Sequence, residues 1–461
     1  SILTYLDVKD NDASGGAALV ATDGTSVRSG SLTNWTFGGS ELFVWNNGGA
    51  DSNWSTAGNW TLNEVPGIDD TIIFDGTSTA ASTRDTSFTT TIAGLKLNNN
   101  YTGTVTLAAP LGVSGAVIIS GGTLDVSTSA HDITVDGDWK QYSSGNFNAN
   151  TGTVILTSTG DTLTLSGSNA FSNLTIDDGL VGYWKMDEGA GTWIKDYSRY
   201  GNHGTLTNSD SDEWVTMTGA GTTNFYNPYA LDLSGSDDSV DAGDTSGSFT
   251  LGTDDFALSG WIKPNSLTQH AIFGKDLAST PYGWAMEIRT SKIRFMGDND
   301  GGAWDIDFYS TSTVSNNEWS HVATVRSGSN WTHYINGVDG GTTTASVTIA
   351  EPSVNLYLGR RGYHATDYKW NGILDDLRIY KRSLSSSEVG SLANGNAYTG
   401  SGVYTLGSAL DVNGDLKMYT GGISGQGSEI SISGSWLNYG GIYTAGTGTI
   451  TFDGSASQAS Q

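Results

Sequence analysis

A five-residue pattern recurs near both ends of this chain: an apolar residue, any residue, a second apolar residue, a small or acidic residue, and glycine. Its copies lie at 72–76, 111–115, 133–137, 410–414, 430–434 and 450–454. The last three are spaced by 20 residues. A period near 20 is typical of stacked β-rungs, each of which buries its apolar face only against its neighbours. The long gap between the two sets predicts one repetitive β-structure interrupted by an inserted domain.

The two repetitive stretches align with each other. The aligned positions are Leu111, Val113, Gly115, Val117 and Ile119 with Leu410, Val412, Gly414, Leu416 and Met418, then Ile133, Val135, Gly137, Trp139 and Tyr142 with Ile430, Ile432, Gly434, Trp436 and Tyr439. We interpret them as one right-handed β-solenoid, with a β-sandwich of meandering strands as the competing interpretation. A further copy of the pattern, at 231–235, falls inside the insert and is treated as coincidental.

The composition favours β-strands joined by many turns. The 461 residues include 63 Gly, and Ser, Thr, Asn and Asp are abundant; these types supply positive φ or bond the backbone locally. Disorder is the alternative for a glycine-rich chain, but 15 Trp, 20 Tyr and 13 Phe can bury a sizeable core. The absence of cysteine excludes disulfides, thiolate metal sites and cysteine nucleophiles.

The charge balance narrows the class of partner. The formal net charge is −27 at pH 7. We expect no nucleic acid as a partner, because binding it requires cationic side chains that neutralise phosphates. An acidic surface either binds divalent cations or only keeps the protein soluble. No apolar run approaches the roughly 20 residues needed to span a bilayer, so we expect no membrane-spanning segment.

Four regions are expected along the chain. They are the end of a preceding β-rich unit (1–40), the first part of the solenoid (41–178), the inserted domain (179–397) and the second part of the solenoid (398–461). The Trp/Asn cluster within 41–76 is expected to cap the solenoid, because an open rung end exposes unpaired strand groups. This cluster resembles the openings of repeat units in bacterial surface and autotransporter-like proteins, which implies an extracellular location at a cell surface.

The insert carries six motifs in the order of a known family. They are Gly182-Tyr183-Trp184-Lys185-Met186-Asp187-Glu188, the loop Asp196–Leu206, Phe256–Pro264, Glu318-Trp319-Ser320-His321-Val322-Ala323, Tyr334-Ile335-Asn336-Gly337, and Leu374-Asp375-Asp376-Leu377-Arg378-Ile379-Tyr380 with Leu384 and Glu388. They resemble a laminin-G-like domain of the concanavalin A-like lectin/glucanase superfamily. The resemblance implies a two-sheet antiparallel jelly roll. The expected fold class is therefore all-β, a β-solenoid (β-helix) interrupted by a jelly-roll β-sandwich.

One helix is expected near the end of the insert. Ser385-Ser386-Ser387-Glu388 supplies a serine cap and a carboxylate close to a helix N-terminus.

The best catalytic candidates are Asp305 and Asp307. Their i, i+2 spacing places both carboxylates on one face of a strand, flanked by aromatics. Retaining glycosidases need two carboxyl groups about 5–5.5 Å apart. We nevertheless favour a polar sheet face, and no serine-hydrolase elbow, phosphate-binding glycine loop or His-Glu-x-x-His metal motif is evident. The expectation is a domain without catalytic residues.

Structural calcium is the one cofactor considered. Hard cations take carboxylate, amide and carbonyl oxygens. The family resemblance places the 196–202 loop beside the strand that carries two adjacent aspartates, which implies Asp196, Asn202, Asp375 and Asp376 as ligands. The alternative is that these residues only cap turns.

Carbohydrate binding is expected in segments without family pattern. Sugar sites combine exposed aromatic rings with polar side chains, and such sites vary in loops. The residues that fit are Trp304, His364, Asp367 and Trp370.

The expected function is adhesion or glycan binding by an extracellular, non-catalytic segment of a larger repetitive protein, with glycans or cell-surface polymers as partners. One alternative is a structural fibre or surface-layer subunit that self-associates end to end through its solenoid. The other is a glycoside hydrolase.

Overall fold

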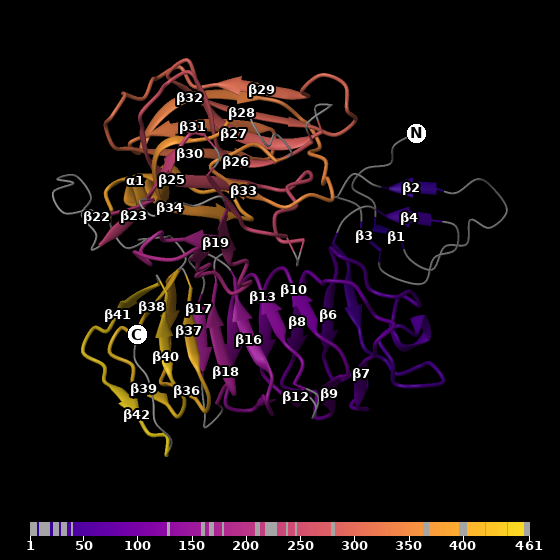
Figure 1. Ribbon diagram of the computed structural model, residues 1–461. Helices are drawn as coiled ribbons and strands as arrows, with labels where there is room; N and C mark the ends of the chain where they lie inside the picture. The colour runs from indigo at the N-terminus through magenta and orange to yellow at the C-terminus, as the bar shows by residue number, and fades with distance from the viewer. Residues whose placement is uncertain are drawn as a thin grey trace. The chain divides into compact units, whose positions relative to one another are not determined.

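The computed structural model is almost entirely β-structure (Figure 1). It describes residues 7–8, 19–21, 27–28, 35–37, 40–126, 130–157, 162–165, 170–177, 179–207, 213–216, 228–236, 238–244, 247–277, 282–362, 368–395, 403–419, 421–439 and 441–455. The chain forms two compact units, Ser1–Asp178 with Ser401–Gln461, and Gly179–Gly400. Within the described residues, no helix combines the length and apolarity needed to cross a membrane.

The first unit is a solenoid of parallel strands that wind around three faces. Its nine-stranded face runs β41 (Ile442–Thr444), β38 (Gly422–Ser424), β35 (Val403–Leu406), β17 (Thr162–Leu165), β14 (Trp139–Gln141), β11 (Val117–Ile119), β8 (Gly94–Leu97), β6 (Thr71–Phe74), β5 (Leu42–Val44). Its six-stranded face runs β10 (Leu111–Val113), β13 (Ile133–Val135), β16 (Thr153–Leu156), β18 (Asn173–Ile176), β37 (Leu416–Met418), β40 (Trp436–Asn438).

The third face of the solenoid consists of two separate sheets. One runs β15 (Asn146–Asn148), β12 (Thr123–Asp125), β9 (Thr104–Leu107), β7 (Ser82–Arg84), and the other runs β36 (Leu410–Val412), β39 (Ile430–Ile432), β42 (Ile450–Phe452). Nearer the N-terminus, two short parallel pairs join β1 (Asp7–Val8) with β3 (Val27–Arg28) and β2 (Leu19–Ala21) with β4 (Trp35–Phe37).

The recurring pattern forms a strand and the corner that follows it. Its two apolar positions are buried on either side of a half-exposed one, as in β39. Its glycine lies where the corners of successive rungs touch: a Cβ added to Gly434 would lie 2.4 Å from the carbonyl carbon of Gly414. The interval near 20 residues is therefore one turn around the three faces, which confirms the predicted solenoid.

The internal alignment is wrong by one face. The copy at 111–113 forms β10 on the six-stranded face, whereas the copy at 410–412 forms β36 on the third face. After the insert, the first strand in the sheet of β10 is β37, which starts at Leu416. The pattern can change face because every face needs the same alternation and every corner admits glycine.

An aromatic cluster covers the core beside β5, the last strand of its sheet. Trp45, Trp54 and Trp60 are each at most 1% exposed. Their rings pack edge to face, with centroids 5.2 Å apart for Trp45 and Trp60 and 6.0 Å for Trp54 and Trp60. A short 3-10 helix, Ala57–Asn59, leads into Trp60. The cluster occupies the segment in which a cap was predicted.

The solenoid continues across the insertion without losing register. Strand β17 pairs with β35 and β18 pairs with β37, so each contacts the first rung after the insert as it would an ordinary neighbour. Between β10 and β11, three residues (114–116) turn the corner from the six-stranded to the nine-stranded face. Between β18 and β35, residues 177–402 occupy the same corner.

The second unit is an antiparallel jelly roll of two sheets. One runs β22 (Trp214–Thr216), β23 (Tyr229–Ser234), β34 (Asn371–Tyr380), β25 (Phe256–Pro264), β30 (Ser320–Ser327), β31 (Asn330–Ile335), β32 (Val338–Thr344), with β19 (Leu180–Trp184) also paired to β34. The other runs β20 (Trp193–Ile194), β21 (Gly204–Thr207), β24 (Ser239–Asp241), β33 (Tyr357–Leu358), β26 (Gln269–Asp276), β27 (Gly283–Arg289), β28 (Lys292–Asp298), β29 (Ile306–Tyr309). An apolar core that includes Trp184, Trp284 and Trp331 is buried in this unit.

Helix α1 (Ser386–Ala393) is where the sequence predicts it. The Ser385 hydroxyl accepts from the backbone N–H of Glu388, and the Glu388 carboxylate accepts from the Ser385 N–H, so two end groups of the helix are satisfied. Its Val389 and Leu392 share a second apolar cluster with residues such as Leu180 and Tyr380.

Candidate functional site

The outer face of β26–β29 carries a row of charged side chains. On β27, Trp284, Met286 and Ile288 belong to the apolar core. Because side chains alternate along a strand, Glu287 points to the other face, where the register sets it opposite Arg294 of β28. Both side chains are almost fully buried, Glu287 completely and Arg294 to within 4%. Burying a charge costs free energy unless the charge is paired, so the charged side chains of this face must be held by specific partners.

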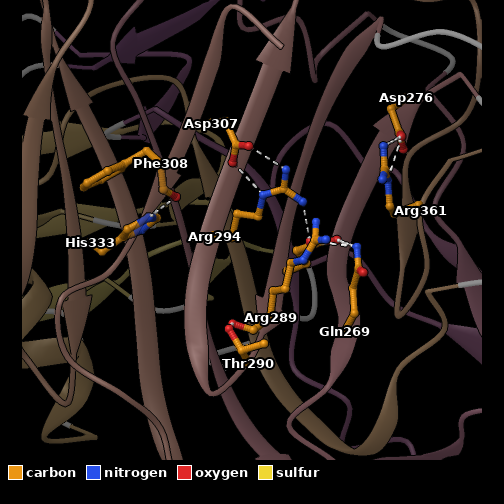
Figure 2. A network of polar contacts seen from close by, with 10 residues as sticks. Gln269, Asp276, Arg289, Thr290, Arg294, Asp307, Phe308, His333 and Arg361 are labelled. Atoms are coloured by element: carbon orange, nitrogen blue, oxygen red, sulfur yellow. Dashed lines mark hydrogen bonds and ion pairs between the residues drawn. The ribbon is translucent and has the colours of Figure 1, made fainter. Parts of the chain in front are cut away.

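Arg294 joins two carboxylates (Figure 2). Its Nη1 donates to Glu287 Oε1 at 2.9 Å, while Nε and Nη2 donate to the two oxygens of Asp307 at 2.6 and 2.8 Å. Gln269 of β26 extends the chain by donating to Glu287 at 3.1 Å. Burial alone would lower the pKa of Arg294, but its hydrogen bonds to Asp307 and Glu287 outweigh burial and raise that pKa above its usual value. The guanidinium is therefore a permanent cation fixed in a bidentate geometry.

The pair Asp305 and Asp307 does not have the freedom of a catalytic dyad. Asp307 binds Arg294 through both oxygens. Asp305 lies just before β29 and accepts from the backbone N–H of Asn299 at 3.3 Å. Both side chains are exposed. The arrangement fits a polar sheet face better than an acid and nucleophile pair.

The segment after β33 crosses directly over one end of this face. A Cβ on Gly274 would lie 2.4 Å from the Arg360 carbonyl oxygen, so only glycine allows the backbone to approach so closely. Arg361 then pairs with the fully buried carboxylate of Asp276, its Nε donating to Oδ2 at 2.8 Å (Figure 2). The Gly362 N–H donates to Oδ1 of the same carboxylate at 2.8 Å. This ion pair fastens the crossing segment to β26.

Two aromatic rings meet at the Arg361 guanidinium. Its Cζ lies 5.2 Å from the ring centre of Trp304 and 5.1 Å from that of Tyr368, both within cation–π range. Both rings are half-buried. Tyr368 has a φ of 62°, a left-handed conformation that costs an aromatic residue about 1–2 kcal/mol. Such strain persists only where surrounding structure holds it and is common at binding sites.

The four predicted carbohydrate-binding residues have different outcomes. Trp304 lies in this aromatic rim. His364 and Asp367 lie outside the described residues, on the segment between Arg361 and Tyr368. Trp370 is fully buried in the core beside His270, so its ring is not available for stacking on a sugar.

Sequence reasoning missed Arg294, Arg361 and Tyr368. A signal for the first exists, because Glu287 and Arg294 are symmetric about a two-residue hairpin turn at Thr290 and Ser291. Both turn residues have positive φ, at 51° and 67°, as the mirror-image hairpin turns require. The usual Asn-Gly or Asp-Gly signature is absent, so the register was not recognised.

The predicted calcium ligands form two groups. The carboxylate of Asp196 accepts four hydrogen bonds: from the backbone N–H groups of Tyr183, Ser198 and Asn202 and from the Ser198 hydroxyl, at 2.7–2.8 Å. That number fills the usual acceptor capacity of a carboxylate. Asp376 pairs with Arg378 at 3.1 Å, and Asp375 is fully buried.

No group of three or more acidic or histidine side chains arranged to hold a metal occurs in the described part of the chain. Calcium stays a prediction, and the geometry of Asp196 favours the alternative of turn bonding.

An ammonium group occupies an oxygen cage elsewhere in this unit. Lys275 Nζ lies 2.9 Å from Asp244 Oδ2 and donates to the carbonyl oxygens of Pro352 and Val354 at 3.0 and 2.9 Å. Glu351 completes the cage at 3.9 Å, and burial raises the pKa of its carboxyl to about 7. The Lys275 ammonium group thus joins β26 to the segments that carry Asp244 and residues 351–354.

Two buried histidines are held neutral. His321 Nε2 lies 2.9 Å from the Ser259 hydroxyl, and burial lowers the pKa of His321 to about 3. His333 lies between the Thr324 hydroxyl (2.9 Å) and the Phe308 carbonyl oxygen (3.0 Å), and burial lowers its pKa to about 4. The second contact ties β31 to β29, across the two sheets (Figure 2). Neither ring is accessible to a substrate, so these contacts are structural.

Comparison with known proteins agrees with the fold of this unit. Residues 234–390 match the family model of the concanavalin A-like lectin/glucanases superfamily. None of the curated proteins matches the sequence. Solved structures with similarity include the binding domain of Paraclostridial Mosquitocidal Protein 1, with 18% identity over 47% of this chain and 52% of that one, at a TM-score of 0.36.

Two further structures belong to this group. Domain 4 of AbnA, a GH43 extracellular arabinanase from Geobacillus stearothermophilus solved with arabinotriose, shows 21% identity over 47% of this chain and 98% of that one, at a TM-score of 0.35. The receptor binding domain of botulinum neurotoxin D shows 16% identity over 47% and 53%, at 0.34. This chain spans about half the length of the toxin domains. The family match and the observed sandwich together identify residues 234–390 as a concanavalin A-like domain, inserted in a β-solenoid.

Proposed function

We propose that the inserted domain binds glycans at a cell surface without cleaving them, as the adhesive part of an extracellular protein whose solenoid carries it. The observation that carries the proposal is the rim of Trp304 and Tyr368 around the Arg361 guanidinium, at one end of a polar sheet face. Aromatic rings stack on the C–H faces of sugars, and fixed polar groups beside them bond hydroxyls.

The absence of cleavage is part of the same proposal. Hydrolysis needs one carboxyl that donates a proton and a second that attacks or activates water. Asp307 is held by the permanent cation Arg294, whose guanidinium donates to both of its oxygens, so neither oxygen is free to attack a sugar. These contacts support a binding role for the face.

The test is a glycan array followed by calorimetry on the best ligand, with Trp304→Ala compared against Trp193→Ala. The control is also a tryptophan of the jelly roll, 51% exposed, on β20 at the opposite edge of the same sheet. We expect Trp304→Ala to weaken binding about tenfold or more, near 1.4 kcal/mol, and the control to bind as the parent does. Loss of binding in the control alone would place the site at the other edge, and no glycan binding at all would refute the proposal.

A second candidate, end-to-end self-association, has one observation in its favour. Ile450 and Phe452 of β42 are 37% and 42% exposed, whereas Ile430 and Ile432 in the same positions of β39 are fully buried. Sedimentation velocity over a concentration series tests it. Growth into polymers that Ile450→Lys abolishes would support the fibre, and a monomer at all concentrations would exclude it.

A further inference from the structure

The rung that precedes the insertion is shorter than its neighbours. Between β14 and β16 lie 11 residues (142–152), which include the third-face strand β15. Between β35 and β37 lie 9 residues (407–415), which include β36. Between β17 and β18 lie only 7 residues (166–172). Of these, Phe171 makes a single bridge to Val412, and no strand is assigned among the described ones.

Within the described residues, the third face has no strand at this rung. One of its sheets ends with β15 and the other begins with β36. A pocket of about 290 Å³ lies at this rung, with walls from Phe147, Asn148, Ala149, Asn150, Ala170, Ser172 and Asn413. This volume lies just below the range for small-molecule sites, roughly 300–1,000 Å³, so the pocket has room for only one small unit of a ligand.

The floor of the pocket is rigid and apolar. Phe147 packs on Trp139 and Phe171, with ring centroids 4.9 and 5.9 Å apart, and Trp139 lies 5.4 Å from Phe171. Phe147 is 7% exposed and Phe171 1%. The three rings hold one another in place, so the walls above them are supported by a packed core.

The walls are polar and uncharged. None of the lining residues is acidic or basic. Asn150 donates to Asp125 at 2.8 Å, but the side chains of Asn148, Ser172 and Asn413 make no hydrogen bond within the described structure. Their two amides and one hydroxyl can each donate and accept, which matches the hydroxyl groups of a sugar. The missing charge disfavours phosphates, carboxylates and amines.

We propose that this pocket binds one residue of a neutral glycan, with the sugar ring against Ala170 above the packed floor and its hydroxyls bonded to Asn148, Ser172 and Asn413. The solenoid would then carry a recognition site of its own, chemically unlike the charged face of the jelly roll. The proposal does not depend on glycan binding by the jelly roll.

The experiment uses the full chain with Trp304→Ala, so that the rim of the jelly roll is disabled. Ligand-observed NMR and calorimetry are run with four neutral trisaccharides, built from glucose, mannose, N-acetylglucosamine and arabinose, and with trigalacturonate and a glucosamine trimer as charged probes. Two pocket variants are compared: Asn148→Ala with Asn413→Ala, which removes the amides, and Ala170→Leu, which fills the space. The matched control is Asn146→Ala, an exposed asparagine of the same strand that does not line the pocket.

We expect at least one neutral probe to bind, both pocket variants to weaken it tenfold or more, and the control to leave it unchanged. Circular dichroism of each variant separates lost binding from lost folding, and the filled and amide-free variants must agree. Absence of binding by all neutral probes, equal binding by the pocket variants, or stronger binding of a charged probe would each overturn the proposal.

Discussion

The two units differ in how many charged side chains they bury. In the described solenoid, Arg84 and Asp177 are the only buried charged residues, and the core is filled by apolar and aromatic side chains. The jelly roll buries Lys275, Asp276, Glu287, Arg294 and Arg361 in ion pairs, together with two histidines. A repeated rung needs only alternation and a glycine at the corner, so its stability is spread over many similar contacts. The jelly roll instead depends on a few specific polar contacts, which makes it sensitive to single substitutions and to pH.

The largest effect is expected from Arg361→Met. It leaves the fully buried Asp276 without its cationic partner, which costs about 3–5 kcal/mol of unfolding free energy. Hydrogen exchange followed separately in each unit should show the loss in the jelly roll alone. The matched control is Arg360→Met. In the parent protein, the Arg360 guanidinium lies over the Tyr357 ring at 3.5 Å and has no carboxylate partner in the described structure. Equal losses of unfolding free energy in the two variants would mean that the buried ion pair contributes no more than an arginine without a carboxylate partner.

Acidification should destabilise the jelly roll more than the solenoid. His321 and His333 have folded-state pKa values of about 3 and 4, below the unfolded value near 6.5. Their contribution is present above pH 6.5 and is lost as pH falls toward the folded values. At pH 5 each would remove about 2 kcal/mol. Glu351, whose pKa is raised to about 7, acts in the opposite direction over part of this range.

The histidine effect can be isolated with His333→Gln. Unfolding of the parent and the variant is followed from pH 7 to pH 5, and we expect a flatter pH dependence in the variant. If the unfolding free energy of the variant depended on pH as steeply as that of the parent, the acid sensitivity would come from other groups.

A small effect is expected from Lys140→Ala in the solenoid. Lys140 pairs with Asp138, but the side chains are 29% and 25% exposed. An ion pair in contact with water contributes about 0–1 kcal/mol, so the variant should unfold within about 1 kcal/mol of the parent. A loss as large as that of Arg361→Met would remove the distinction between the two units.

Calcium should have the smallest effect. A site with a Kd of about 0.1 mM would stabilise the jelly roll by about 2 kcal/mol at 5 mM Ca²⁺. Because Asp196 already accepts four hydrogen bonds, we expect a change below about 0.5 kcal/mol on adding Ca²⁺ or a chelator. Thermal unfolding checks this, with Asp196→Asn as a probe. A calcium-dependent shift that this variant abolishes would establish the predicted site.

Local patterns predicted the solenoid because every rung repeats simple rules, whereas the jelly roll was expected from the resemblance of six motifs to a known family. Alternation and corner glycines are visible in any rung, and Ser385 with Glu388 marks the helix start. The five-residue pattern does not determine, however, which strand it pairs with or in which direction. The copy at Leu231–Gly235 forms β23, which pairs antiparallel with β34, and its glycine has a φ of 79°. The same five residue types therefore build a parallel rung or an antiparallel strand, depending on what lies beside them.

The candidate site was predicted less completely, for a physical reason. Trp304, whose role in binding stays a prediction, was chosen because it lies in a segment without family pattern. The residues that hold it come together only through strand register and the crossing segment: Arg361 reaches Asp276 across 85 positions of sequence. Trp370 was misjudged because a tryptophan in a variable segment looks the same whether its ring is exposed or packed in a core.

The uninterrupted register of β17 with β35 and β18 with β37 has a consequence for how the chain is made. When the ribosome has completed β18, the next rung of the solenoid lies 226 residues away, beyond Ile176 and before Val403. At roughly 5–20 residues per second, those residues take about 10–45 s to synthesise. Throughout that interval the edges of β17 and β18 have no following rung, and an unpaired edge invites pairing with other chains. The speed at which the jelly roll is translated therefore sets how long the nascent solenoid is exposed to misassembly.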